Sequence, residues 1–439
     1  MSPTVTANAD LDTAVAEARG AYVAARPKSK ALHEEAAKVL PGGNTRTVLF
    51  YEPFPTVMER GAGARLWDVE GHEYLDLLGE FTAGIYGHSD PTIRAAIDGA
   101  LDNGVNLASH GANEPKLARL LLERFPSLER VRFTNSGTEA NLMALALATA
   151  FTGRRQVMVF AGGYHGGVLT FGGGTGGKVN VPHDIVLAPY NDAETSVRMI
   201  REAGDKLAAV LVEPMLGSGG CIPGEAAFLQ ALRATTRETG ALLILDEVMT
   251  SRLGPGGRQA ALGVVPDLTT LGKYIGGGMS VGAFGGRADI MDLFDPRRPD
   301  ALPHAGTFNN NVLTMAAGVA GLSKVFTPEV SLALNARGDR LRERLNALGE
   351  ARGAAFQATG LGSLLTLHPM RGPIRTPADA AKADSRLRDL LFFELMARGY
   401  YLARRGMIAL SLPVTDAELD GLVEAVGDIL DTHRTLFTA

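Results

Sequence analysis

Two charged residues stand at the ends of predicted strands, where side chains are placed to do chemistry. The apolar run Leu242–Leu245 leads directly to Asp246, and the run Leu268–Leu271 leads through Gly272 to Lys273. In an open parallel sheet, ligands bind at the carboxyl ends of the strands. A lysine walled in by apolar residues and glycines is partly desolvated, which favours a neutral amine able to condense with an aldehyde. Taken singly, Asp246 also fits a helix cap and Lys273 an exposed loop.

Together, these two residues point to one cofactor. Pyridoxal 5′-phosphate (PLP) needs an amine to hold its aldehyde and a carboxylate to keep its pyridine nitrogen protonated. Lys273 and Asp246, on consecutive strands, supply both groups. We therefore expect PLP to be held as a Schiff base on Lys273, with Asp246 beside the ring nitrogen.

Two polar turns are suited to the phosphate of such a cofactor. A predicted strand runs into Ser136, Gly137 and Thr138, where a helix begins, and Thr307 stands before a later helix. Backbone N–H groups at a helix start, together with hydroxyls, bind phosphate. Each turn also fits an ordinary helix N-cap, and taken in isolation the Ser136–Thr138 turn fits a plain N-cap better.

An aromatic residue between glycines follows another predicted strand. Tyr164 in the segment Gly162–Gly166 is placed to lie flat over a planar ring, although it also fits a loop aromatic that closes the edge of a core. His165 is a second polar group near the ring or a helix cap. We do not expect it to be the base, because in this chemistry the released lysine amine moves the proton.

Composition narrows the range of partners and compartments. The chain has 439 residues, a net charge of −5 and a single cysteine, Cys221, so a disulfide framework within the chain is excluded and a reducing cytoplasm is expected. No basic run favours nucleic acid, no apolar run is long enough for a bilayer, and the start Met1–Val5 does not read as a signal peptide. Neither metal-ligand spacing nor a phosphate-binding P-loop is present.

The order of predicted elements gives the fold class. Strand-like runs alternate with helical stretches through the middle of the chain, which is typical of an α/β domain with a mainly parallel central sheet. The runs are Val131–Thr134, Val157–Phe160, Ile185–Ala188, Ala209–Val212, Ala241–Leu245 and Leu268–Leu271.

The two ends of the chain have a different pattern of predicted helices and strands from its middle. A helix is predicted from Leu11 to Val39, strands at Leu361–Leu367 and Met407–Leu412, and helices beginning at Thr327 and Thr415. We expect a large domain over residues 76–320 and a smaller α+β domain over residues 321–439, with residues 1–75 packed against the smaller one.

In this order, the motifs resemble those of the class III aminotransferases of PLP fold type I. The resemblance runs from about Leu32 to about Thr432 and rests on Asn135–Ala140, Tyr164–Gly166, Asp246–Val248, Gly272–Lys273 and Gly306–Phe308. It implies a large PLP-binding domain, a smaller α+β domain and an obligate homodimer with two active sites at the interface.

The resemblance also implies a role for each motif residue. Lys273 would form the Schiff base and Asp246 would pair with the pyridinium nitrogen. Tyr164 would stack on one face of the ring and Val248 would pack on the other. The phosphate would be held by Ser136, Gly137 and Thr138 and by Thr307 of the neighbouring subunit.

Two branches of the class look similar to this chain. Pro41–Asn44 and Gly276–Ala283 resemble glutamate-1-semialdehyde 2,1-aminomutase, which is an isomerase. Asn44–Tyr51, Thr82–His88 and Asp246–Leu253 are closer to the transaminases of β-amino acids such as β-phenylalanine, which is the branch we favour.

The favoured branch implies a pocket for a carboxylate and an aryl group. Arg46 would hold a substrate carboxylate, and Arg405, on a loop that reads as mobile, would clamp the second carboxylate of 2-oxoglutarate and swing out for the aryl ring. Phe81 and Tyr86 would form the apolar wall. Without the resemblance, we would expect both arginines to be surface residues.

The expected reaction is a ping-pong transamination. An amino donor leaves its nitrogen on the enzyme, and an α-keto acid, 2-oxoglutarate or pyruvate, then collects it. Two alternatives remain. The aminomutase would need no acceptor, and a non-catalytic PLP-fold protein would be expected to lack Lys273 or Asp246.

Overall fold

The computed structural model describes residues 10–438, so the Met1–Val5 segment lies outside the described residues. In this part of the chain, the largest sheet has the strand order β4-β12-β11-β10-β7-β5-β6. Only β12 is antiparallel to its neighbours there. The strands are β4 (Arg130–Thr134), β5 (Gln156–Phe160), β6 (Asp184–Ala188), β7 (Leu207–Val212), β10 (Leu242–Asp246), β11 (Leu268–Gly272) and β12 (Gly282–Gly286).

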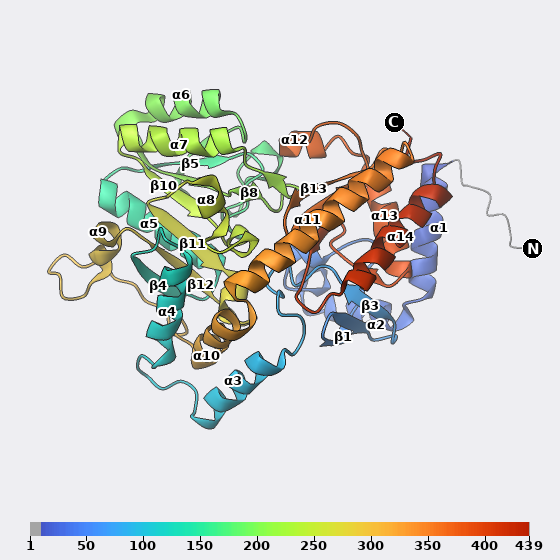
Figure 1. Ribbon diagram of the computed structural model, residues 1–439, viewed down its shortest axis with the longest axis horizontal. Coiled ribbons are helices and arrows are strands. Elements are labelled where there is room, and N and C mark those ends of the chain that lie inside the picture. The colour runs from blue at the N-terminus through green and yellow to red at the C-terminus, as the bar shows by residue number, and fades with distance from the viewer. Residues whose placement is uncertain (1–9, 439) are drawn as a thin grey trace, which may run out of the picture.

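Both faces of the central strands β5, β7 and β10 are buried, which explains why these strands are nearly continuous apolar runs. Along β10, Leu243 and Leu245 pack with α6 (Ala193–Ala203) and α7 (Ala226–Thr239), whereas Leu242 and Ile244 pack with α5 (Gly137–Thr152). Figure 1 shows α6 and α7 together along one side of the sheet. The remaining helices of this region are α3 (Pro91–Asp102), α4 (Asn113–Arg124), α8 (Gly257–Leu262), α9 (Ala288–Met291) and α10 (Val312–Ala320), with the hairpin of β8 (Met215–Leu216) and β9 (Ile222–Pro223).

The C-terminal part forms a second, smaller layer of helices and antiparallel strands. Its sheet has the order β13-β14-β16. The long helix α11 runs diagonally between this part and the large sheet (Figure 1). The elements are α11 (Pro328–Ala351), β13 (Gln357–Leu361), β14 (Leu364–His368), α12 (Pro377–Ala380), α13 (Ser385–Ala397), β16 (Met407–Ala409) and α14 (Asp416–Thr432).

The N-terminal segment packs with this smaller part. Its antiparallel strands β1 (Met58–Ala62), β2 (Arg65–Asp68) and β3 (Glu73–Asp76) are extended by β15 (Tyr400–Tyr401), which is parallel to β3. Helix α1 (Leu11–Ala24) packs on α13. These contacts support the predicted domain division, whose boundaries at residues 76 and 321 stay a prediction.

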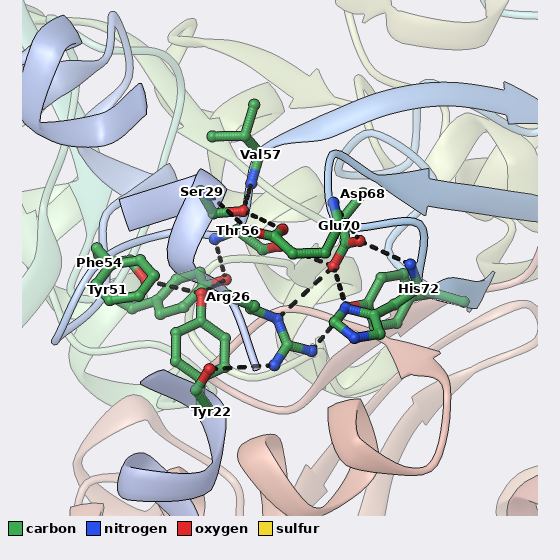
Figure 2. Close-up of polar contacts among 11 residues, drawn as sticks. Tyr22, Arg26, Ser29, Tyr51, Phe54, Thr56, Val57, Asp68, Glu70 and His72 are labelled. Carbon is green, nitrogen blue, oxygen red and sulfur yellow. Dashed lines mark hydrogen bonds and ion pairs between the residues drawn. The ribbon is translucent and has the colours of Figure 1, made fainter. Parts of the chain in front are cut away.

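A buried carboxylate ties the N-terminal helices to the β2–β3 hairpin (Figure 2). Asp68 is fully buried and accepts hydrogen bonds from the Tyr74 hydroxyl at 2.6 Å and the His72 backbone N–H at 2.8 Å, and its Oδ2 lies 3.7 Å from Nε of Arg26. Asp68, Glu70 and His72 place their ligand atoms within 4.8 Å of one another, a spacing that a metal ion requires. A cation there would meet the Arg26 guanidinium, so we assign the group a structural role.

Three predicted elements are wrong in their extent. The expected helix from Leu11 to Val39 is two helices, α1 and α2 (Pro27–Ala36), because Pro27 lacks the N–H that a continuous helix needs. The expected strand Leu361–Leu367 is interrupted by a hairpin turn: Leu361 ends β13, Gly362 lies in the turn with φ 52°, and Leu364–Leu367 belong to β14. The expected strand Met407–Leu412 ends at Ala409.

Candidate active site

Asp246 and Lys273 meet at one edge of the large sheet. Strands β10 and β11 are parallel neighbours, with Asp246 paired to Thr270, and Lys273 follows the end of β11. Lys273 adopts φ 58°, a left-handed conformation that non-glycine residues rarely take. Burial lowers the pKa of the Lys273 amine, and the nearby carboxylate of Asp246 opposes this shift. The amine is thus partly desolvated, as the sequence predicts.

Asp246 is buried and held in one orientation. Its Oδ1 accepts the Val248 N–H at 3.0 Å, and its Oδ2 lies 2.8 Å from both Asn141 Nδ2 and His165 Nδ1. Asn141 is fixed in turn by the Thr270 hydroxyl, which donates to its Oδ1 at 2.7 Å. His165 therefore contacts the carboxylate, and it would act on a bound ring through Asp246.

The Ser136–Thr138 turn is the start of helix α5. Ser136 caps α5, because its Oγ accepts the Glu139 N–H at 3.2 Å, and its own hydroxyl proton is still available to donate. A Cβ on Gly137 would come within 2.9 Å of the Val248 methyl groups, so any larger residue there would require Val248 to shift. Thr138 lies against Gly166, whose φ of 127° excludes other residues.

The backbone of Tyr164 is held by a buried acidic residue, Glu213, which was not predicted from the sequence. The side chain of Tyr164 is 49% exposed, whereas its backbone N–H donates to Oε1 of Glu213 at 2.8 Å. The other oxygen of Glu213 accepts the Gly217 N–H at 3.0 Å. Burial raises the pKa of Glu213 to about 7, although His165 opposes the shift.

Two guanidinium groups lie over one phenyl ring. The Cζ atoms of Arg46 and Arg405 are 5.8 and 5.2 Å from the centre of the Phe81 ring. Arg46 is exposed and pairs with Glu80 at 2.5 Å. Arg405 is partly buried, and burial lowers its pKa. Within residues 10–438 its Nε donates no hydrogen bond, and its Nη2 donates to Sδ of Met407 at 3.2 Å. Arg405 is therefore the guanidinium that lacks an anionic partner.

Arg405 stands in a tight turn, not on the loose loop that the sequence suggested. The Gly406 N–H donates to the Ala403 carbonyl at 2.7 Å, and Gly406 has φ 90°. The adjacent Arg404 is fixed by both carboxylate oxygens of Asp389, at 2.6 and 2.9 Å. A cavity of about 290 Å³ opens beside this turn, and Phe81 and Arg405 are among its lining residues.

Two predicted site residues lie elsewhere. Tyr86 is buried in the core, where its hydroxyl donates to the Tyr274 carbonyl at 3.0 Å, so the structure does not bring it to the Phe81 wall. Thr307 is exposed in a turn. Helix α10 begins only at Val312 and is capped by Asn311, so Thr307 is not the residue before the helix.

Some site residues carried little signal in the sequence. Glu213 follows the buried strand β7, and Asp246 ends the buried strand β10. An acidic residue at the end of an apolar strand could therefore have identified Glu213 from the sequence. Asn141 lies one turn into α5, where an amide on a buried face usually has a polar partner, yet nothing in the sequence names that partner. Glu80 could not be assigned, because its contact with Arg46 depends on the fold.

The comparisons with known proteins decide the family. The family model described as "Aminotransferase class-III" matches residues 50–426. The chain belongs to this family. Its members transfer amino groups, and this aminotransferase uses PLP as its cofactor.

The class III aminotransferase is similar over nearly its whole length to characterised relatives. It is 55% identical over 98% of both chains to a "Beta-phenylalanine transaminase" of Variovorax paradoxus, and the solved structure of a β-phenylalanine aminotransferase from that organism superposes with a TM-score of 0.96, covering 98% of this chain and 99% of the other. A glutamate-1-semialdehyde 2,1-aminomutase of Heliobacterium modesticaldum is 38% identical over 91% of this chain and 95% of the relative.

The structure of an omega-transaminase from Sphaerobacter thermophilus is also similar. It is 39% identical and superposes with a TM-score of 0.88, covering 94% of this chain and 99% of the other. The type I fold predicted from the motifs is thus confirmed, as are the class and the cofactor.

The residues at the sheet edge fit PLP. A buried carboxylate held by Val248, Asn141 and His165 suits the ring nitrogen, and a desolvated amine after the neighbouring strand suits the aldehyde. The start of α5, which Ser136 caps and which has a glycine at its first position, suits the phosphate. In the described part of the chain, no helix is both long and apolar enough to cross a membrane.

Proposed function

We propose that this enzyme moves the amino group of an aromatic β-amino acid of the β-phenylalanine kind to 2-oxoglutarate or pyruvate. The observation that carries the proposal is the placement of Arg46 and Arg405 over the ring of Phe81. A substrate with one carboxylate and one aryl group finds a cation and an apolar surface side by side there. The 55% identity to a β-phenylalanine transaminase along the full chain supports the same substrate class.

The proposed roles at the sheet edge follow from the contacts. When bound, PLP supplies an aldehyde that condenses with amines and a ring that withdraws electrons from the carbon next to nitrogen. Asp246, fixed by Val248 N–H and His165, would keep the ring nitrogen protonated. Lys273 would hold the cofactor and, once released, carry the proton from the substrate carbon, since its lowered pKa leaves more free amine.

The other contacts are assigned to binding. Ser136, Gly137 and Thr138 would hold the phosphate at the start of α5, between Val248 and Gly166. Tyr164 would cover one face of the ring and Val248 the other.

The sequence led us to expect Arg46 at the substrate carboxylate, but we propose Arg405 for this role, because it has no anionic partner among the described residues. Arg46 becomes available to the second carboxylate of 2-oxoglutarate once Glu80 releases it.

We also propose that two chains share their active sites in a homodimer in the cytoplasm. Thr307 precedes Phe308, which is 56% exposed, and Leu107 is 53% exposed. The two segments are in contact, because Asn310 Nδ2 donates to the Ser109 carbonyl at 3.3 Å. Exposed apolar side chains of this kind mark surfaces that associate. Sedimentation is expected to give a species of twice 46.2 kDa. The variant Thr307→Ala, expected to lower PLP affinity, tests whether this hydroxyl reaches a neighbouring site.

Initial rates with both substrates varied test the activity. A transaminase that releases its first product before the acceptor binds gives parallel double-reciprocal lines and needs an α-keto acid. A panel of β- and α-amino acids with one acceptor then ranks the donors. Turnover of β-phenylalanine without any acceptor would instead favour an aminomutase, and no turnover of any aromatic β-amino acid would contradict the proposal.

A further inference from the structure

The turn that carries Phe81 has an unusual backbone. Gly79, Glu80, Phe81 and Thr82 have φ values of 53°, 47°, 50° and 83°. Left-handed conformations are rare for residues other than glycine, and for a β-branched residue such as threonine they are outliers. Three such residues in succession form a strained turn, and strain of this kind persists only where surrounding contacts impose it.

The side chains of the turn do not explain its stability. Thr82 is 1% exposed, and its hydroxyl has no hydrogen-bond partner in the described structure. The turn is closed by a backbone bond from Gly84 N–H to the Gly79 carbonyl at 2.8 Å, and Gly79 N–H donates to the side-chain Oδ1 of Asp76 at 2.9 Å. These bonds hold the two ends of the turn, and the carbonyl of Thr82 is held by a different group.

That group is the guanidinium of Arg252. Its Nη1 donates to the Thr82 carbonyl at 3.2 Å, its Nε donates to the Ser363 hydroxyl at 3.1 Å, and its Nη2 donates to the Leu410 carbonyl. These acceptors come from the strained turn, from the hairpin turn before β14 and from the segment after β16. Arg252 itself belongs to the segment that follows Asp246 and β10.

Arg252 is a charge buried without a counter-ion. Its side chain is 1% exposed, and within residues 10–438 it forms no ion pair. Burial lowers the pKa of Arg252 to about 10, so the group stays charged at neutral pH. An unpaired buried charge is costly, and it is tolerated here only because three neutral oxygens satisfy its donors. An arginine that served packing alone would be replaceable by an apolar residue.

The two sides of the proposed carboxylate site, the turn with Phe81 and the turn with Arg405, are both connected to groups that Arg252 binds. The strained turn holds Phe81 and Glu80, which contact Arg46. Strand β16 begins two residues after Arg405 and leads to Leu410. One guanidinium thus joins the turn that carries Phe81 to Leu410, directly after β16, the strand that follows the Arg405 turn.

We propose that Arg252 is a positioning residue that holds the left-handed turn Gly79–Thr82 against the β16 segment and thereby sets the carboxylate-binding place between Arg46 and Arg405. The inference rests on the proposed function for those two arginines. It assigns Arg252 no contact with the cofactor or with reacting atoms.

The test compares Arg252→Lys with a matched control, Arg233→Lys. Lysine keeps the charge but cannot serve three acceptors in a fork. Arg233 is likewise buried, but it pairs with Asp267 at the opposite end of the strands. In Arg252→Lys the KM for donor and acceptor should each rise about tenfold, with kcat within about threefold and the absorbance of bound cofactor unchanged. Arg233→Lys should leave both KM values unchanged.

A rescue variant separates positioning from general stability. Thr82→Gly keeps the carbonyl that Arg252 binds and removes the strain, since glycine adopts φ 83° freely. Added to Arg252→Lys, it should return both KM values to within about threefold of wild type. Unchanged KM values in Arg252→Lys, or no rescue by Thr82→Gly, would overturn the proposal.

Hydrogen exchange gives a readout that needs no substrate. Amides of residues 77–85 should exchange about tenfold faster in Arg252→Lys and at the wild-type rate in Arg233→Lys. If wild type fails to turn over β-amino acids, the proposed function fails, but this comparison of exchange rates still decides the role of Arg252.

If Arg252→Lys does not fold, the variant Ser363→Ala provides the test. It removes only the acceptor of Arg252 Nε and should raise both KM values about threefold. No rise in either KM would overturn the proposal.

Discussion

At the scale of single residues, Asp246 combines burial with a fixed orientation. Asp246→Asn keeps the size of the side chain and removes the charge that would pair with the ring nitrogen. A charge-assisted hydrogen bond contributes about 1.5–3 kcal/mol, so kcat/KM should fall at least roughly tenfold to a hundredfold. Asp267→Asn is the matched control, because Asp267 is a buried carboxylate at the other end of the sheet, held by Arg233. Equal losses in both variants would contradict the assigned role.

Glu80 is expected to restrain Arg46 in the absence of a dicarboxylate. The ion pair is well exposed, and exposed pairs contribute about 0.2–1 kcal/mol. Glu80→Gln should therefore lower the KM for 2-oxoglutarate by up to about fivefold, with a smaller effect on pyruvate, which has a single carboxylate. Initial rates at varied acceptor concentration measure this, and a raised KM for 2-oxoglutarate would show that Glu80 does not compete for Arg46.

The residues that sequence reasoning located have a common property. Lys273, Asp246 and Ser136 all stand where a strand ends, and strand ends are visible in an apolar pattern. Glu80 and Arg252 were not predictable as functional residues, because their contacts come from segments about 35 to 170 positions away in the chain. Tyr86 was wrongly expected in the apolar wall of the substrate pocket, because the sequence around Phe81 does not show which side chains point into the core.

At the scale of elements, the start of α5 sets how closely phosphate can approach. Gly137→Ala would place a Cβ 2.9 Å from the Val248 methyl groups. Such overpacking costs about 1–3 kcal/mol, so PLP should bind roughly tenfold or more weakly although alanine favours a helix. Absorbance titration of the apoenzyme measures the affinity. Gly99→Ala is the control, because a Cβ in α3 at Gly99 meets open space; its affinity should equal wild type.

The boundaries of elements were less predictable than their order. Strands β10 and β11 appear where the apolar runs stand, because both faces of the sheet are buried. The helix break at Pro27 and the hairpin at Gly362 were missed, since a helical period continues across Pro27 and apolar residues flank Gly362 on both sides.

At the scale of the whole molecule, Asp68 joins the N-terminal helices to the β2–β3 hairpin (Figure 2). Asp68→Asn leaves Arg26 buried without its counter-ion, which should cost roughly 3 kcal/mol of unfolding free energy at pH 7. Urea unfolding at two pH values measures this. Arg94→Gln, which breaks an exposed ion pair of Arg94 with Asp98, serves as the control and should change stability by less than about 0.5 kcal/mol.

The sign of the pH dependence follows from the carboxyl group. Burial raises the pKa of Asp68, but hydrogen bonds from Tyr74 and His72 outweigh it, and the net pKa is lowered. A lowered folded-state pKa gives stability that is present above the unfolded value of about 3.9 and is lost as pH falls through the folded value. The difference between wild type and Asp68→Asn should therefore shrink below about pH 4. A constant difference down to pH 2 would contradict the assignment.

The central claim is tested most directly by counting product in a single half-reaction. The PLP-loaded enzyme is mixed with excess β-phenylalanine and no keto acid, and the β-keto acid released per active site is quantified. The account predicts one equivalent per site and then arrest, with turnover resuming when 2-oxoglutarate or pyruvate is added, and no product with Lys273→Ala. Continued turnover without an acceptor, or no β-keto acid at all, would contradict it.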